Sequence, residues 1–246
     1  GLGYDRVMSI ALQIECRGDN IVKLDTGKKS ISPIGQKETH EFLSALNDFY
    51  RTSRFNDFFN THTDIYELGL QVFNDSVMAH FDQEWYTRFY GTPPAEQFRI
   101  IIGFTNGPCN YGPSRKLTGQ PKEVFAIMNY AVDDNERPIF YKKVVETVVH
   151  EFCHSFTKIK GDTEKALEKS GKALQEYTYF SMRRQAYSTW RNILEESLVR
   201  AATICYLIDH DYDEKDIRNA IIEQVDRNFF WMPELVQTLR YYESHR

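Results

Sequence analysis

Apolar side chains recur every three or four residues along most of the chain, a spacing that predicts amphipathic helices. This spacing covers residues 4–15, breaks at the turn-forming segments RGDN and DTGKK, and resumes from residue 39 to the GTPP segment that begins at residue 91. We therefore expect one helix over 4–15, then a loop, then two or three amphipathic helices. Together these elements form a predicted helical N-terminal part over residues 1–97.

The pattern changes between residues 98 and 132. The segments FRIIIGF (98–104) and EVFAIMNYAV (123–132) are short and rich in Ile, Val, Phe and Tyr, which favours strands. The segment between them, TNGPCNYGPSRKLTGQP, is rich in Gly, Pro and Asn and predicts a long irregular loop, which is a kind of segment that often lines a site. We expect a small sheet and a long loop over 98–132.

Helical spacing then returns over 139–246. The expected helices cover residues 139–158, 163–188, 188–208, 213–229 and 233–242. Helices on both sides of a short β segment predict an α+β fold that is predominantly α-helical. A chain of 246 residues is compatible with a single domain over 1–246.

Composition and charge exclude several classes of protein. Hydrophobic residues make up 41% and charged residues 26%, as in soluble globular proteins. The formal net charge is -5 and basic residues are scattered among acidic ones, so no nucleic-acid partner is expected. No run of 18 apolar residues is present and charges interrupt the N-terminal segment, so neither a membrane span nor a signal peptide is expected in this chain. The 4 cysteines form no C-x-x-C pair, which argues against a zinc ribbon.

The segment TVVHEFCHSF (147–156) carries the pattern with the clearest chemistry. On the predicted helix, His150 and His154 are four residues apart, so both imidazoles project from one side and can reach a single metal ion. Zinc bound in this way leaves a position for water, and Glu151 follows the first histidine as the candidate general base. The expected cofactor is Zn²⁺.

The residues around this motif favour a zinc helix over a chance pattern on a solvated helix. The extended zinc-peptidase pattern has Val or Thr three residues before the first His, uncharged flanks, and a hydrophobic residue two after the second His. Thr147 and Phe156 occupy those positions, and Cys153 is best interpreted as a small core residue. A charge on the buried side of such a helix would cost several kcal/mol.

A third ligand is expected on the helix STWRNILEESLVRAATICYLI. Glu195 and Glu196 lie 41 and 42 residues after His154 on this helix. An apolar stripe that includes Leu194 and Leu198 places Glu195 near its edge, whereas Glu196 shares a polar face with Arg200. Helical phase leaves both glutamates open as the ligand.

His150-Glu151-x-x-His154 followed by a glutamate on a later helix resembles the gluzincin class of zinc metallopeptidases. More closely, the segments GLGYDRVMSIALQI, HEFCHSF and AYSTWRNILEESLVRA resemble a family of uncharacterised bacterial proteins regarded as zinc metallopeptidases with unknown substrates. The resemblance implies a zincin-like domain with its small sheet beside the HExxH helix, a secreted, periplasmic or cell-surface location, and Glu196 as the third ligand. Arg200 stands where thermolysin-like gluzincins carry Asp, so we expect it to pair with a protein carboxylate or with a substrate C-terminus.

These inferences lead to a hypothesis of peptide hydrolysis. Zinc held by His150, His154 and Glu196 would activate water, Glu151 would transfer protons, and one of the two strands would pair with an extended peptide or protein substrate. Tyr187 is the first candidate to stabilise the oxyanion. Further candidates for that role are His210, Tyr111 and Tyr212. The alternatives are an inactive metal-binding module and a helical interaction domain whose motif is accidental.

Overall fold

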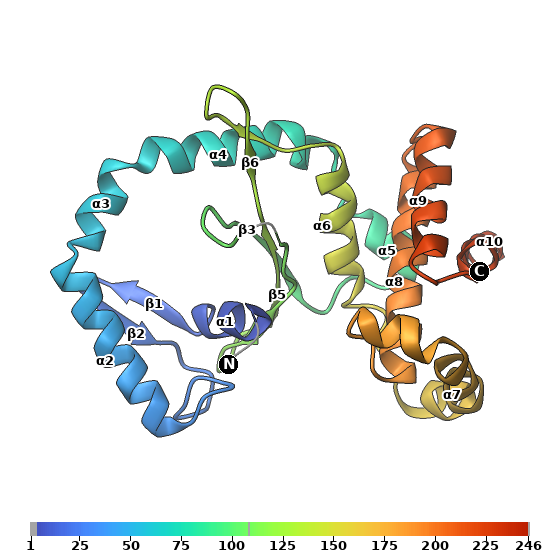
Figure 1. Cartoon of the computed structure of the whole chain (residues 1–246), viewed down its shortest axis with the longest axis horizontal. Helices are drawn as coiled ribbons and strands as arrows, with labels where there is room; N and C mark the ends of the chain where they lie inside the picture. Colours follow the sequence, from blue (N-terminus) through green and yellow to red (C-terminus); the bar gives the residue numbers. More distant parts are fainter. Residues whose placement is uncertain (1–3, 108, 246) are drawn as a thin grey trace. The chain divides into compact units, whose positions relative to one another are not determined.

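The computed structural model describes residues 4–107 and 109–245 (Figure 1). The chain divides into two compact units. Unit 1 comprises Gly1–Phe81 and Ala95–Val145, and unit 2 comprises Asp82–Pro94 and Glu146–Arg246. Helices predominate and the strands form small sheets, which confirms the α+β prediction. The prediction of a single zincin-like domain over 1–246 stays a prediction.

Unit 1 begins with a helix and a hairpin in place of one long helix. Helix α1 (Tyr4–Ala11) ends before the predicted limit, and β1 (Ile14–Arg17) pairs antiparallel with β2 (Asn20–Lys23). The turn between them contains Gly18 at φ 59°, a left-handed conformation that glycine adopts without strain. The turn predicted at RGDN is present between these strands, whereas Ile14 and Glu15 belong to β1 and not to the predicted helix.

The helices predicted between residues 39 and 90 are present but more numerous than expected. In unit 1 they are α2 (Gln36–Thr52), α3 (Phe55–Thr61), α4 (Thr63–Ser76) and the 3-10 turn η1 (Met78–His80). The left-handed Arg54, at φ 53°, separates α2 from α3, which explains the additional break.

The small sheet of unit 1 has the strand order β3-β5-β4. Its strands are β3 (Gln97–Ile102), β4 (Ser114–Lys116) and β5 (Lys122–Met128). β3 runs parallel to β5 and β4 runs antiparallel to it, so β4 lies inside the segment expected to be an irregular loop. Of the two predicted strands, β5 is paired on both sides and β3 lies at an edge. A separate two-stranded sheet contains β6 (Ala131–Val132) and β7 (Pro138–Ile139).

Unit 2 is a helical bundle around one buried helix. Its helices are α5 (Trp85–Tyr90), α6 (Lys143–Cys153, from Glu146 on), α7 (Gly161–Arg184), α8 (Trp190–Asp209), α9 (Glu214–Asp226) and α10 (Met232–Ser244). Helix α8 contacts α7, α9 and α10, and most of its residues are buried. The predicted helices of this part are confirmed with shifted ends, except that Ile139 belongs to β7 and not to α6.

Helix α5 joins α6 to α8 within unit 2. The indole Nε1 of Trp85 donates to Asp209 Oδ2 on α8 at 2.7 Å, and the Tyr86 hydroxyl donates to the carbonyl of Val149 on α6 at 3.2 Å. Both aromatic side chains are buried. These bonds connect α5 to both α6, which carries His150, and α8, which carries Glu196.

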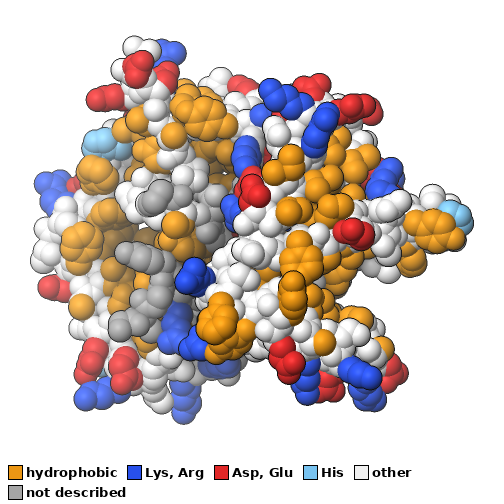
Figure 2. Space-filling model, turned by 45° about the vertical axis from the view of Figure 1, so that its right-hand side comes forward, with side chains coloured by type: hydrophobic (Ala, Val, Ile, Leu, Met, Phe, Trp, Pro, Cys, Tyr) orange, Lys and Arg blue, Asp and Glu red, His pale blue; other side chains and the backbone are white. Residues whose placement is uncertain are grey.

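On the face shown in Figure 2, basic, acidic and hydrophobic side chains all reach the surface. Within the described part of the chain, no helix has both the length and the apolar character needed to cross a membrane.

We expect Gly171→Ala to destabilise unit 2 because α7 and α8 approach closely there. A Cβ at Gly171 would lie 2.5 Å from Cε3 of the buried Trp190. Overpacking of this kind costs about 1–3 kcal/mol, which outweighs the helix-propensity gain of up to about 1 kcal/mol. Urea unfolding measures the change, with the exposed neighbour substitution Ser170→Ala as the control. An unchanged or higher free energy of unfolding for Gly171→Ala would contradict the close packing.

Candidate metal centre

Helix α6 buries one face and ends beside the second histidine. Val145, Val148, Val149, Phe152 and Cys153 are all buried. This burial confirms the expectation that the uncharged residues around the motif form a packed helix face. The helix ends at Cys153, and backbone bonds from Ser155 to Phe152 and from Phe156 to Cys153 turn the chain there. His154 is therefore the first residue after the helix and lies in a tight turn.

Helix α8 brings a carboxylate to this place from within the bundle. Its N-cap is Thr189, whose side chain accepts a hydrogen bond from the N–H of Asn192. Such a cap stabilises the start of a helix by about 1 kcal/mol. Glu196 lies in the second turn and is only 6% exposed. A carboxylate this deeply buried requires partners of opposite charge or a metal.

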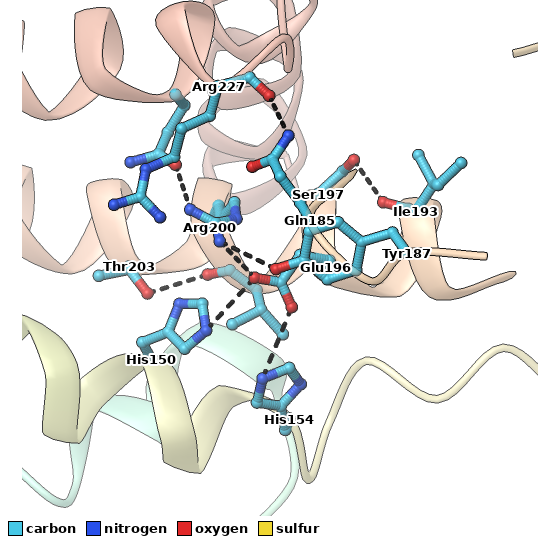
Figure 3. A network of polar contacts seen from close by, with 12 residues as sticks. His150, His154, Gln185, Tyr187, Ile193, Glu196, Ser197, Arg200, Thr203 and Arg227 are labelled. Atoms are coloured by element: carbon cyan, nitrogen blue, oxygen red, sulfur yellow. Dashed lines mark hydrogen bonds and ion pairs between the residues drawn. The ribbon is translucent and has the colours of Figure 1, made fainter. Parts of the chain in front are cut away.

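The side chains of His150, His154 and Glu196 converge (Figure 3). Nε2 of His150 lies 3.5 Å from Glu196 Oε1, and Nε2 of His154 lies 3.7 Å from Glu196 Oε2. One potential ligand atom from each residue lies within 4.8 Å of the others. In a tetrahedral zinc site with bonds of about 2.0–2.1 Å, neighbouring ligand atoms are about 3.3 Å apart. Each histidine lies at about that distance from one of the two carboxylate oxygens, and the group as a whole is compact enough to hold a metal ion.

The protonation states of the three side chains suit metal binding. Burial lowers the pKa of His150 to about 3 and also lowers the pKa of His154, so both imidazoles are neutral at physiological pH. Burial opposes ionisation of Glu196, but the charged Arg200 guanidinium and the hydrogen bond from the Tyr187 hydroxyl lower its pKa below the ordinary value. The site therefore presents two lone-pair nitrogens and one carboxylate.

Glu195 and Glu196, between which helical phase does not choose, have different partners. Glu195 accepts hydrogen bonds from the backbone N–H of Ile159 at 3.0 Å and from Lys158 Nζ at 3.1 Å. It therefore anchors the segment that follows His154 to α8. Glu196 faces the histidines, as the resemblance implied.

Arg200 lies behind Glu196 in a nearly buried position. Its Nη2 is 2.8 Å from Glu196 Oε1 and donates to the Tyr187 hydroxyl at 3.1 Å. Nη1 donates to Gln224 Oε1, and the guanidinium carbon lies 4.9 Å from the centre of the Phe229 ring. The expected pairing with a protein carboxylate is thus present, and contact of Arg200 with a substrate carboxylate stays a prediction.

Among the candidates for oxyanion stabilisation, Tyr187 lies beside the histidine–glutamate group, which consists of His150, His154 and Glu196. Its hydroxyl accepts a hydrogen bond from Arg200 and is hydrogen-bonded to Glu196. Tyr187 follows α7, and burial together with the negative charge of Glu196 raises the pKa of its phenol, so the hydroxyl keeps its proton. His210 instead contacts Asp82, with its Nε2 3.2 Å from Oδ2. Tyr111 belongs to unit 1, where it bridges to Ile127, and the N–H of Tyr212 donates to Leu207.

The other two chemically notable residues of the motif lie on α6. Glu151 is half-buried and directly follows His150. Cys153 is fully buried, and burial raises the pKa of its thiol to about 12. A thiol in that state is not a nucleophile at neutral pH, which agrees with its interpretation as a core residue.

Two residues that hold Arg200 were not predicted from the sequence. Gln224 lies on α9 and Phe229 lies shortly after that helix ends. They belong to no predicted motif, and a single glutamine or phenylalanine is typical of any packed helical segment.

We expect Arg200→Leu to destabilise the metal-free protein by about 3 kcal/mol or more, because Glu196 would lose its compensating charge in a buried position. Metal bound to Glu196 would supply positive charge, so the decrease in the free energy of unfolding should be smaller in the zinc-loaded protein. Urea unfolding with and without Zn²⁺ measures both values.

Arg227→Leu is the matched control for this substitution. Arg227 forms a more exposed ion pair with Glu223 at 2.8 Å, so its loss should cost at most about 1 kcal/mol in either state. Equal losses for Arg200→Leu with and without zinc would contradict the predicted coupling.

The family of this chain follows from its sequence. No curated protein and no solved structure matches it. The sequence profile of one family, described as Domain of unknown function (DUF4932), matches residues 2–246, so the chain belongs to that family.

Proposed function

We propose that this protein is a zinc-dependent metallopeptidase of the gluzincin kind with a zincin-like fold. One observation carries the proposal: two neutral histidines from α6 and its end meet an ionised glutamate from α8, and a second glutamate directly follows the first histidine. A random helix with the HExxH pattern would not bring a buried carboxylate to the same point.

The donor set fits zinc. Imidazole nitrogens and a single carboxylate are ligands that Zn²⁺ accepts, and three protein ligands are typical of zinc sites that act on substrates. Bound zinc would polarise a carbonyl group and lower the pKa of water. The ligands would be His150 Nε2, His154 Nε2 and one carboxylate oxygen of Glu196, while Arg200 holds the other oxygen.

The remaining roles belong to side chains of the chain itself. Glu151 accepts a proton from the attacking water and delivers it to the leaving amine. Tyr187 keeps its proton and donates a hydrogen bond to the oxygen that becomes negative. Arg200 positions Glu196 and Tyr187 through one guanidinium group.

The test begins with wild-type protein purified without chelators. Mass spectrometry should find stoichiometric zinc, and a broad peptide library should show cleavage that stops with a chelator and returns with Zn²⁺. Absence of stoichiometric metal would refute the proposal. Bound zinc without cleavage of any library peptide would instead favour the inactive metal-binding module.

A further inference from the structure

Unit 1 contains a cavity of about 580 Å³ that plays no part in the proposed peptidase site. Its wall comes from three segments: α1, the residues after β2, and β4 with the turn that follows it. Small-molecule sites in proteins commonly have volumes of about 300–1,000 Å³. The cavity is therefore large enough for a small metabolite.

The described charged side chains that line the cavity are all positive. Arg6, Lys28, Arg115 and Lys116 line it, and no Asp or Glu is among its described lining residues. The carboxylate of Asp25 lies next to the wall, where it is hydrogen-bonded to Thr118. Arg6, Lys28 and Lys116 make no ion pair with any residue that the structure describes. This concentration of positive charge occurs in a chain whose formal net charge is -5. Unpaired cations around one cavity favour an anionic ligand.

The wall is held in place by hydrogen bonds between its segments. The buried side chain of Gln13 donates to the carbonyl of Ser32 at 2.7 Å and accepts from the Ser32 N–H at 3.0 Å. Arg115 donates from Nη1 to the carbonyl of Leu12 at 2.9 Å and from Nε to Glu123 at 2.6 Å. The Nη2 group of Arg115 takes part in neither bond. A cation fixed in this way binds a ligand with little loss of side-chain entropy.

Hydroxyl groups complete the wall. Ser9, Thr26, Ser32, Ser114 and Thr118 all line the cavity. The Thr26 hydroxyl is buried and has no hydrogen-bond partner among the described residues, an arrangement that is rare in folded proteins without a ligand or water. None of the described residues that line the cavity is aromatic, so these residues offer no stacking surface to a nucleobase.

We propose that this cavity binds a small phosphorylated sugar. Lysine and arginine would contact the phosphate groups, and the serine and threonine hydroxyls would contact the hydroxyl groups of the sugar. This second site lies wholly in unit 1 and does not depend on the metal centre or on peptidase activity.

Calorimetric titration of the full chain with fructose 1,6-bisphosphate at low ionic strength tests the proposal. Saturable binding at one site is expected, with weaker affinity as salt is added. Lys28→Ser and Lys116→Ser should each weaken binding by at least about tenfold, since hydrogen bonds to charged groups contribute about that factor. Lys29→Ser removes an equally exposed neighbouring charge that does not line the cavity, and it should leave the affinity unchanged.

Three results would overturn the proposal. The first is no saturable binding of the bisphosphate by the wild-type chain. The second is equal affinity for inorganic phosphate or for fructose, which would show that the cavity does not recognise a phosphorylated sugar. The third is an equal loss of affinity in Lys29→Ser, which would show only a general effect of charge. Urea unfolding of the three variants should match the wild type, because all three lysines are exposed.

Discussion

Glu196→Gln is expected to lower the affinity for Zn²⁺ by more than about 100-fold. A residue that only hydrogen-bonds to a metal ligand contributes up to about 100-fold to metal affinity, so the loss of a ligand itself should cost more. The substitution keeps the shape of the side chain and replaces a charged ligand with a weakly donating amide. It also leaves Arg200 without its ion-pair partner. Competition with a chromophoric chelator measures the affinity.

Glu195→Gln provides a control one residue away on the same helix. Glu195 binds Ile159 and Lys158 and does not face the histidines, so this variant should keep its zinc and lose only some stability. Circular dichroism separates loss of metal from loss of fold, and His154→Ala should lose zinc in the same way. Full zinc affinity in Glu196→Gln, or equal losses in the two glutamine variants, would contradict the assignment of the third ligand.

Glu151→Gln is expected to reduce cleavage of any library peptide by about 10²–10⁴-fold, which is the usual contribution of general acid–base catalysis. The amide cannot accept the proton from water, whereas the three metal-binding side chains are unchanged. The variant should therefore contain as much zinc as the wild type. The measurements are kcat/KM for a cleaved peptide and zinc content by mass spectrometry.

Glu146→Gln, one turn earlier on α6, controls for the loss of a negative charge on this helix. Its activity should remain close to that of the wild type. Cleavage that persists in Glu151→Gln would remove this residue from the proposed mechanism. Zinc loss in that variant would instead indicate that Glu151 takes part in holding the metal.

The histidine positions could be predicted from the sequence because their chemistry depends on local spacing. Four residues along a helix bring two side chains to one side, and the turn that follows α6 keeps His154 beside His150 although the helix ends at Cys153. The burial of Val148 and Phe152 also follows from local pattern, since the apolar face of α6 repeats at helical spacing.

The positions of Glu195 and Glu196 around the axis of α8 could not show which of them is the candidate third ligand. The reason is that α8 does not have one buried face and one exposed face. The predicted buried stripe included Leu194 and Leu198, which are only half-buried, whereas the charged Glu196 is buried. A helix surrounded by α7, α9 and α10 buries several faces, so polarity no longer reports which side faces the solvent. The expectation of Glu196 came from the resemblance of the sequence segments, and the position of Glu196 beside the histidines agrees with it.

Contacts between distant segments were also beyond sequence patterns. The hairpin of β1 and β2 depends on pairing across a short turn, where the helical spacing of residues 4–15 was misleading. Likewise, the net charge of the whole chain does not reveal that three segments of unit 1 place four positively charged side chains around one cavity.

The position of α5 in the sequence affects when unit 2 can assemble during synthesis. Trp85 and Tyr86 leave the ribosome well before α6 and α8, the helices that bury them. The segment between α5 and α6 belongs to unit 1, so a nascent chain can complete the sheet of that unit while these two aromatic rings still lack their partners. Unit 2, and with it the histidine–glutamate group, can form only after α8 has been made.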